Sequence, residues 1–285
     1  MKAESLELEL VGVAVDAYQP SGAAVGRVDD ASEGAAVLLG KRVLVSPLDA
    51  CGQCEVCRRG GAAVCPLAKR HEPGPRMRVA SRWVVALGDG LELPLPAAAA
   101  VAGDVTTAYT LYARTGLSSR EPVVLIGTNA ITRFLVEILR GKGITPTVIV
   151  DRDDAAWTDW LLAKGAAAIQ ASDGALQSTV TAAIAAQGQG SRPWRLIVTD
   201  AAALPRAVAL VGPRATLTVL TSGATPALPG EVLAREVTII GVAGPHPDLV
   251  VEAAALCVKG EIDLVGGISS GPHTDVTRAT VIALG

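Results

Sequence analysis

The chain has 285 residues, a formal net charge of −3 and 50% hydrophobic residues, and only 3% of its residues are aromatic. This composition supplies ample material for a folded core and excludes a mainly disordered chain. The slightly acidic balance argues against nucleic acid or an anionic membrane surface as the main partner. No stretch approaches the ~20 uninterrupted apolar residues that a membrane-spanning helix needs. The acidic N-terminus is unlike a secretion signal, so we expect a cytoplasmic protein with no membrane partner.

Three zones follow one another along the chain. Residues 1–104 combine short β-like runs with Gly and Pro breaks, which predicts a small, mostly β domain. Residues 105–244 alternate continuous apolar runs with helix-length segments, which is typical of a parallel sheet covered on both faces. Residues 245–285 hold one helix, expected at 248–259, and a polar tail. The expected fold is therefore α/β.

Individual elements are predicted from the same patterns. The β-like runs of the first zone are 6–15, 42–47 and 82–86. The strands expected in the parallel sheet are 123–126, 147–150, 196–198, 216–220 and 237–242. The helices expected between them are 131–142, 155–164, 174–186 and 201–211.

Four of the five cysteines lie in one short segment, with the spacing Cys51-x2-Cys54-x2-Cys57-x7-Cys65. In a reducing compartment this spacing indicates a metal site rather than disulfides. Four thiolates complete the tetrahedral shell of Zn²⁺ and leave no position for water or substrate, so such a site is structural. The alternative is four free thiols in a loop. Cys257 lies in an apolar run and is expected to be a buried helix thiol.

The segment GKRVLVSPLDACGQCEVCRRGGAAVC, residues 40–65, resembles the structural-zinc lobe of the zinc-type alcohol dehydrogenases. These enzymes belong to the medium-chain dehydrogenase/reductase superfamily. The resemblance extends from about residue 22 to the C-terminus. It implies a GroES-like domain at 1–104 with one structural Zn²⁺ in a lobe at 51–65, and a Rossmann domain with a doubly wound parallel sheet at 105–244. It further implies that 245–285 returns to pack on the first domain, and that the protein forms a homodimer through the Rossmann domain.

The segment VVLIGTNAITRFLVEILRGKGITPTVIVD predicts a strand, then Gly127, a helix and a second strand that ends at Asp151. This pattern is the first βαβ unit of a dinucleotide-binding fold, in which such an acid accepts the ribose hydroxyls of NAD. Arg152 keeps NADP open as the less favoured choice. Only the first glycine of G-x-G-x-x-G remains, because Asn129 and Thr132 occupy the other two positions. The alternative is therefore a Rossmann-like fold that no longer binds a nucleotide.

The family resemblance implies further cofactor contacts after the later strands. The residues expected to bind NAD(H) are Gly127, Thr128, Asn129, Ala130, Ile131, Asp151, Arg152, Thr199, Leu220, Thr221, Ser222 and Val242. The turn at 241–248 resembles the one that family members place beside the nicotinamide amide. His246 in this turn is either a substrate-pocket group or an exposed turn histidine.

Zinc-dependent family members hold a second, catalytic metal. In SGAAVGRV, residues 21–28, Gly22 stands where the family motif has its metal-binding histidine. The cysteine-bearing segment of that metal site is absent, and the N-terminal portion is shorter than in the family. Asp104 remains at the third ligand position, and one carboxylate does not make a zinc site. We therefore expect no catalytic zinc.

Zinc-free members of the superfamily, such as quinone and enoyl reductases, reduce activated C=C bonds. The resemblance therefore implies an NAD(H)-dependent reductase of an α,β-unsaturated carbonyl or a small enoyl-CoA thioester, such as dimethylacrylyl-CoA reduced to isovaleryl-CoA. The expected catalytic residues are Tyr109 as proton donor, with Asp104 and Thr107; the alternative for Tyr109 is helix packing. Two further functions stay open: an alcohol or hydroxyacyl dehydrogenase with a side-chain base, and a zinc-stabilised pseudoenzyme that binds a nucleotide without turnover.

Overall fold

The structure is a computed structural model that describes most of the chain in separate stretches. These are residues 7–16, 23–71, 74–87, 93–118, 121–150, 154–170, 174–188, 195–220, 230–269 and 279–283. The chain divides into two compact units: unit 1 comprises Met1–Thr107 and Pro245–Gly285, and unit 2 comprises Ala108–Gly244. Among the described helices, none has both the length and the apolar character needed to cross a membrane.

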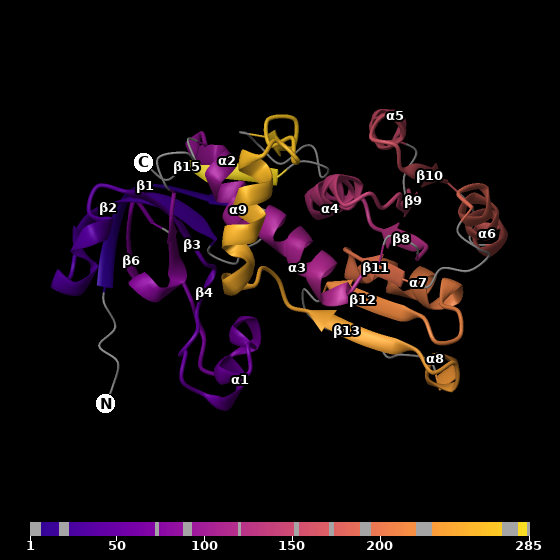
Figure 1. Ribbon diagram of the computed structural model, residues 1–285, viewed down its shortest axis with the longest axis horizontal. Helices are drawn as coiled ribbons and strands as arrows, with labels where there is room; N and C mark the ends of the chain where they lie inside the picture. The colour runs from indigo at the N-terminus through magenta and orange to yellow at the C-terminus, as the bar shows by residue number, and fades with distance from the viewer. Residues whose placement is uncertain are drawn as a thin grey trace. The chain divides into compact units, whose positions relative to one another are not determined.

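Unit 1 is built on a mostly antiparallel sheet in which β1 is the longest strand (Figure 1). The hydrogen-bonded order is β14-β15-β1-β2-β3-β7, and β6 also pairs with β1. The strands are β1 (Glu7–Asp16), β2 (Ala24–Ala31), β3 (Arg42–Val45), β6 (Arg76–Ala80), β7 (Val84–Ala86), β14 (Ile268–Ser269) and β15 (Ala279–Ala283). Buried Leu8, Leu10, Val43, Val45 and Met77 share one core cluster on this sheet.

The C-terminal region contains more than the expected helix and polar tail. Besides α9 (Val250–Val258) it holds β14 and β15, and β15 pairs antiparallel with the last three residues of β1. The expectation of a polar tail was wrong because a five-residue strand carries little periodicity of its own. Its hydrogen-bond partner lies at the opposite end of the chain, where local pattern gives no information about it.

The remaining elements of unit 1 are short. The hairpin β4 (Leu48–Asp49) and β5 (Lys69–Arg70) encloses the cysteine segment, which includes α1 (Glu55–Arg58). A continuous helical segment then runs through α2 (Leu95–Ala100), a π-helical turn at Val101–Val105 and α3 (Thr106–Thr115). Short 3-10 helices occur at Glu33–Leu38, Ala62–Val64, Ser81–Trp83, Ala201–Ala203 and Pro247–Leu249, the fourth of them in unit 2.

Unit 2 contains a six-stranded, entirely parallel sheet with the order β10-β9-β8-β11-β12-β13. The strands are β8 (Val123–Ile126), β9 (Thr147–Ile149), β10 (Ala167–Ile169), β11 (Arg195–Val198), β12 (Thr216–Leu220) and β13 (Thr238–Val242). The helices are the larger part of α3, which begins in unit 1, and α4 (Ala130–Gly141), α5 (Ala155–Ala163), α6 (Leu176–Ala186), α7 (Leu204–Leu210) and α8 (Gly230–Ala234). The chain starts at β8, moves outward to β10, and then returns to the other side of β8. This reversal is the topological switch point of a doubly wound fold.

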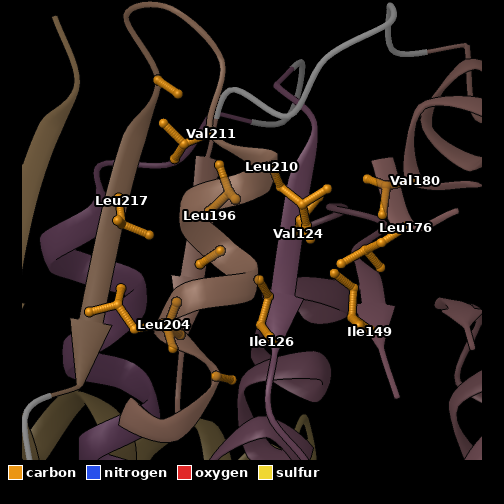
Figure 2. Close-up of a cluster of buried hydrophobic side chains, with 14 of the residues drawn as sticks. Val124, Ile126, Ile149, Leu176, Val180, Leu196, Leu204, Leu210, Val211 and Leu217 are labelled. Carbon is orange, nitrogen blue, oxygen red and sulfur yellow. The ribbon is translucent and has the colours of Figure 1, made fainter. Parts of the chain in front are cut away.

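The central strands of unit 2 are buried on both faces, as their continuous apolar runs predicted, whereas the edge strand β13, predicted from the apolar run 237–242, is exposed at Thr238, Ile239 and Gly241. All four residues of β8 are buried. On one face, side chains from β8, β9, β11 and β12 meet those of α6 and α7, as Figure 2 shows for Val124, Leu196, Leu176 and Leu204. Small and branched side chains allow this close layering, which explains why so few aromatic residues are needed.

A salt bridge joins the beginnings of β8 and β11. Arg195 donates from Nε to Glu121 Oε2 at 3.1 Å and from Nη2 to Glu121 Oε1 at 3.0 Å, which is a bidentate pair. The backbone N–H and the hydroxyl of Ser118 also donate to Glu121 Oε2. Burial raises the pKa of Glu121, but the hydrogen bonds from Arg195 and Ser118 outweigh it, and the pKa is lowered overall.

We expect Glu121→Gln to destabilise unit 2 at neutral pH and to have little effect in acid. A lowered folded-state pKa contributes stability above the unfolded-state pKa, and this contribution is lost as the pH falls through the folded-state value. Urea denaturation of both proteins at neutral pH and below roughly pH 4 tests this sign. A destabilisation that is equally large at both pH values would contradict the ion-pair explanation.

Candidate zinc lobe and nucleotide-binding edge

The four clustered cysteines bring their sulfur atoms together. The Sγ atoms of Cys51, Cys54, Cys57 and Cys65 all lie within 4.8 Å of one another. Three Sγ–Sγ distances are 3.9 Å (Cys51 to Cys57), 3.8 Å (Cys54 to Cys65) and 3.6 Å (Cys51 to Cys65). A tetrahedral site with Zn–S bonds of about 2.3 Å has sulfur–sulfur separations of about 3.8 Å. These three separations match the tetrahedral value to within about 0.2 Å, so the arrangement fits Zn²⁺.

The backbone of the lobe also prepares the sulfur atoms as ligands. The N–H of Cys54 donates to Cys51 Sγ at 3.3 Å, and the N–H of Cys57 donates to Cys54 Sγ at 3.4 Å. Backbone hydrogen bonds lower the pKa of the Cys51 thiol to about 6, whereas burial raises the pKa of the Cys57 thiol to about 12. Zinc binds thiolates, so metal binding must deprotonate Cys57 and releases protons as it does so. Among the described residues, these cysteines are the one group of metal-ligating side chains with such geometry.

Residues outside the cysteine segment fasten the lobe by hydrogen bonds, among them Trp83 and His246. Trp83 donates from Nε1 to the carbonyl of Ala50 at 2.9 Å, directly before the first ligand. His246 lies with Nε2 2.8 Å from the carbonyl oxygen of Gly60, just after the third ligand. The expectation of an exposed turn histidine was wrong, because His246 is only 5% exposed. Neither anchor was predicted, because each joins residues far apart in the sequence.

The predicted nucleotide-binding residues that the structure describes gather at one edge of the parallel sheet. Residues 127–131 follow β8, Thr199 follows β11, and Leu220 and Val242 are the last residues of β12 and β13. Parallel strands place their carboxyl ends at the same edge, and ligands of doubly wound folds bind there. Asp151, Arg152, Thr221 and Ser222 lie outside the described residues, as does Gly22.

Gly127 meets the requirement of the first fingerprint glycine. Its φ of +136° is a conformation that side chains rarely adopt, and a Cβ here would lie 2.2 Å from Thr199 Oγ1. The turn therefore admits only glycine and brings the start of α4 close to the end of β11. This is the tight turn that a dinucleotide pyrophosphate needs at the N-terminus of the following helix.

The two lost glycines are replaced by a hydrogen-bonded cluster. Asn129 caps α4, because its Oδ1 accepts from the Thr132 N–H at 2.9 Å, and its Nδ2 donates to the Thr199 carbonyl at 3.2 Å. The hydroxyls of Thr132 and Thr199 are 2.6 Å apart. The cap satisfies the third N–H of the helix, and helix geometry leaves those of Ala130 and Ile131 without intrahelical acceptors. These two N–H groups are the ones expected to donate to a pyrophosphate at this helix N-terminus.

The three predicted catalytic residues lie along one helical segment. Asp104 is completely buried in the π-helical turn, and such turns are frequent at functional sites. Thr107 is also completely buried, and its hydroxyl donates to the carbonyl of Gly103 at 2.9 Å. Tyr109 is partly exposed, and its ring centroid lies 5.7 Å from that of Tyr112. The roles assigned to these residues stay predictions.

The chain shares its fold with solved dehydrogenases. A short chain alcohol dehydrogenase from E. coli CFT073, solved with the cofactor NADH, matches 97% of this chain and 91% of its own length, with a TM-score of 0.80 and 16% identity. Alcohol dehydrogenase TADH from Thermus sp. ATN1 matches 93% and 85%, with a TM-score of 0.79 and 18% identity. Galactitol-1-phosphate dehydrogenase from Escherichia coli matches 99% and 94%, with a TM-score of 0.79 and 16% identity.

This likeness confirms the predicted fold class, an α/β chain with a Rossmann-type parallel sheet and a smaller, mostly β part that carries the cysteine lobe. No protein-family model and no curated protein matches the chain.

Proposed function

We propose that this protein is an NAD(H)-dependent oxidoreductase of the medium-chain dehydrogenase/reductase type that works without a catalytic zinc ion. The observation that carries the proposal is the Gly127 turn at the switch point of the parallel sheet, in a chain that also holds a four-cysteine zinc lobe. The solved structures of the same fold support it, since one of them contains NADH. In this proposal residues 105–244 bind the cofactor, and residues 1–104 with the return segment 245–285 bind the substrate.

The chain's own residues would hold the cofactor by its phosphates and ribose. The N–H groups of Ala130 and Ile131 face the pyrophosphate, and Asp151 accepts the adenosine ribose hydroxyls, which favours NAD over NADP. NADH, when bound, supplies a hydride. The structural Zn²⁺ takes no part in this chemistry because its four thiolate ligands leave no open position.

We propose an activated C=C bond as the reacting group, in an α,β-unsaturated carbonyl or a small enoyl-CoA thioester. The substrate's own carbonyl then takes up the charge that hydride addition creates, so no Lewis acid is required. Gly22 at the position of the family's metal-binding histidine supports this choice. Tyr109 is the proposed proton donor, because it carries the titratable hydroxyl nearest in sequence to Asp104 and is partly exposed.

A second candidate is an alcohol or polyol dehydrogenase that uses a side-chain base. It is favoured by the solved structures of this fold, which include alcohol dehydrogenases and galactitol-1-phosphate dehydrogenase. Asp104 would be the candidate base, since it is a carboxylate held in the π-helical turn.

Two measurements separate these functions. NADH fluorescence titration tests cofactor binding, and its failure would leave the non-catalytic pseudoenzyme. NADH oxidation is then followed with small enoyl-CoA thioesters, enones and quinones, and NAD⁺ reduction with alcohols, polyols and hydroxyacyl thioesters. We expect turnover in the first panel, with enoyl-CoA thioesters the best substrates. Turnover confined to the second panel would establish the dehydrogenase instead.

For the proton donor, we expect Tyr109→Phe to slow turnover by about 10²-fold, the low end for a positioned general acid, and to leave NADH affinity nearly unchanged. Tyr112→Phe is the matched control, because Tyr112 lies three residues further along the same helix and packs beside Tyr109. Steady-state kinetics with the best substrate decide the question. A fully active Tyr109→Phe protein would return Tyr109 to a packing role.

We further propose that the protein is cytoplasmic, where reducing conditions keep the cysteines available to zinc, and that it forms a homodimer through the Rossmann unit. The edge strand β13 supports the dimer, because it pairs with β12 on one side and Ile239 is 37% exposed. An edge strand can pair with its counterpart in a second copy.

A further inference from the structure

His246 occupies a particular place in the chain. Unit 2 ends at Gly244, so His246 is the second residue after the chain returns to unit 1. It lies in a turn between β13 and α9 in which residues 244–247 are all buried. Both ring nitrogens of His246 make hydrogen bonds. Nδ1 accepts from the N–H of Asp248 at 3.3 Å, and Nε2 lies 2.8 Å from the carbonyl oxygen of Gly60.

The Gly60 contact fixes the role of Nε2. A carbonyl oxygen can only accept, so Nε2 carries a proton and donates it in this hydrogen bond. Nδ1 lies beside Asp248, 3.3 Å from its backbone nitrogen and 3.6 Å from its carboxylate Oδ2. The histidine is therefore a two-sided connector, with one nitrogen capping its own turn and the other holding the zinc lobe.

The Gly60 carbonyl lies just after the C-terminal end of α1, where backbone hydrogen bonds hold the chain. The N–H of Gly61 donates to the carbonyl of Val56, and that of Gly60 donates to the carbonyl of Cys57. This pair of bonds is a Schellman motif, which needs a left-handed residue at Gly60, and its φ is +76°. The carbonyl that His246 contacts is thus positioned by α1, whose ends carry the ligands Cys54 and Cys57.

We propose that His246 is a positioning residue that fastens the turn after β13 to the zinc lobe, so that the structural zinc supports this turn and not only its own lobe. Zinc orders α1, α1 sets the direction of the Gly60 carbonyl, and the carbonyl holds His246. The link to cofactor binding rests on the proposed function, with Val242 at the end of β13 among the residues expected to bind NAD(H).

Two substitutions of His246 test the hydrogen bonds of its two ring nitrogens separately. His246→Asn keeps a side-chain acceptor at the position of Nδ1 and is too short to reach Gly60. His246→Gln keeps an N–H donor at the position of Nε2 and loses the acceptor that caps Asp248. Trp83→Phe is the control, because it removes another hydrogen bond to the lobe, the one from Trp83 Nε1 to the Ala50 carbonyl, and leaves His246 in place.

The first readout is zinc release from the zinc-loaded protein into a colorimetric chelator. We expect His246→Asn to release zinc about threefold to tenfold faster than the wild type, the equivalent of one neutral hydrogen bond. We expect His246→Gln to release it at the wild-type rate. Equal rates in the wild type and both variants would overturn the proposal. Equally fast release from both variants would also overturn it, because the cap on Asp248 would then be the essential contact.

The second readout is amide hydrogen exchange in the peptide that spans residues 243–249. Zinc removal should raise exchange there in the wild type and in His246→Gln, and should change it little in His246→Asn, where the connection is already broken. Trp83→Phe should still respond to zinc removal. A segment that ignores zinc in the wild type would overturn the proposal.

The third readout joins the proposal to the cofactor. His246→Asn should raise the KM for NADH by about threefold to tenfold with kcat unchanged, whereas Trp83→Phe should leave this KM unaltered. An unchanged KM in His246→Asn would overturn the link to the cofactor. A wild-type protein that does not bind NADH would reject the proposed function, and the zinc-release and exchange experiments would still decide the role of His246.

Discussion

Replacing Cys54 with serine is expected to abolish zinc binding and to destabilise unit 1 strongly. The wild-type protein should contain one zinc per chain, because its four sulfur atoms lie within 4.8 Å of one another and three of their separations are 3.6, 3.8 and 3.9 Å. Structural zinc is worth about 10–16 kcal/mol in zinc-finger peptides, and this binding energy appears as folding energy. Loss of one ligand should therefore lower the free energy of unfolding of unit 1 by several kcal/mol.

Elemental analysis and urea denaturation measure the two effects. Cys257→Ser is the matched control, because Cys257 is a buried thiol of α9 outside the cluster, and this variant should keep its zinc. Two equivalents of zinc in the wild type would contradict our expectation that the protein has no catalytic zinc. Brief exposure to a chelator, too short to empty the lobe, should leave the initial rate of turnover intact.

Gly127→Ala is expected to cost about 3 kcal/mol or more of unfolding free energy and to abolish NADH binding. The added Cβ would overlap Thr199 Oγ1, which cannot easily move away because it is bonded to the hydroxyl of Thr132 and to the carbonyl of Ile126. The backbone would also be strained at a φ of +136°. Relief of both effects requires the start of α4 to move, and this would displace the N–H groups proposed to hold the pyrophosphate.

Two variants separate the contributions to this effect. Gly143→Ala has the backbone strain alone, since its φ is +72° and no atom lies within 4 Å of the added Cβ, so it should cost only about 1–2 kcal/mol. Thr199→Ala added to Gly127→Ala removes the overlapping hydroxyl and should recover part of the stability. Urea denaturation and NADH titration give both quantities. Equal costs for Gly127→Ala and Gly143→Ala would falsify the close approach of α4 to β11.

The features that the sequence predicted best depend on neighbouring residues. The strand predictions 123–126 and 216–220 agree with β8 and β12, because continuous apolar runs between helices have no other way to be buried. The cysteine site could also be predicted from the sequence, since all four ligands lie within one short segment whose spacing is typical of a zinc site. Short elements escaped prediction: β10 has three residues and α8 has five, too few to show a period.

In the candidate site, too, the local features could be predicted from the sequence and the long-range contacts could not. The sequence alone indicated the Gly127 turn and the loss of the two later glycines. That Asn129 and Thr132 are bonded to Thr199 required the fold, because these residues meet only when β8 and β11 become neighbours. A polar residue directly before the helix was the one local signal that Asn129 would cap it.

The sequence by itself therefore determined the alternation of strands and helices, the zinc-binding spacing and the glycine turn, because each is a pattern among residues close along the chain. The tertiary structure decided the contacts that fasten these parts: β15 beside β1, Trp83 on Ala50, and His246 on Gly60. A buried polar group must find a partner, but nothing in its local pattern says which distant carbonyl will be within reach. Only the packing of the elements places His246 beside a residue 186 positions away.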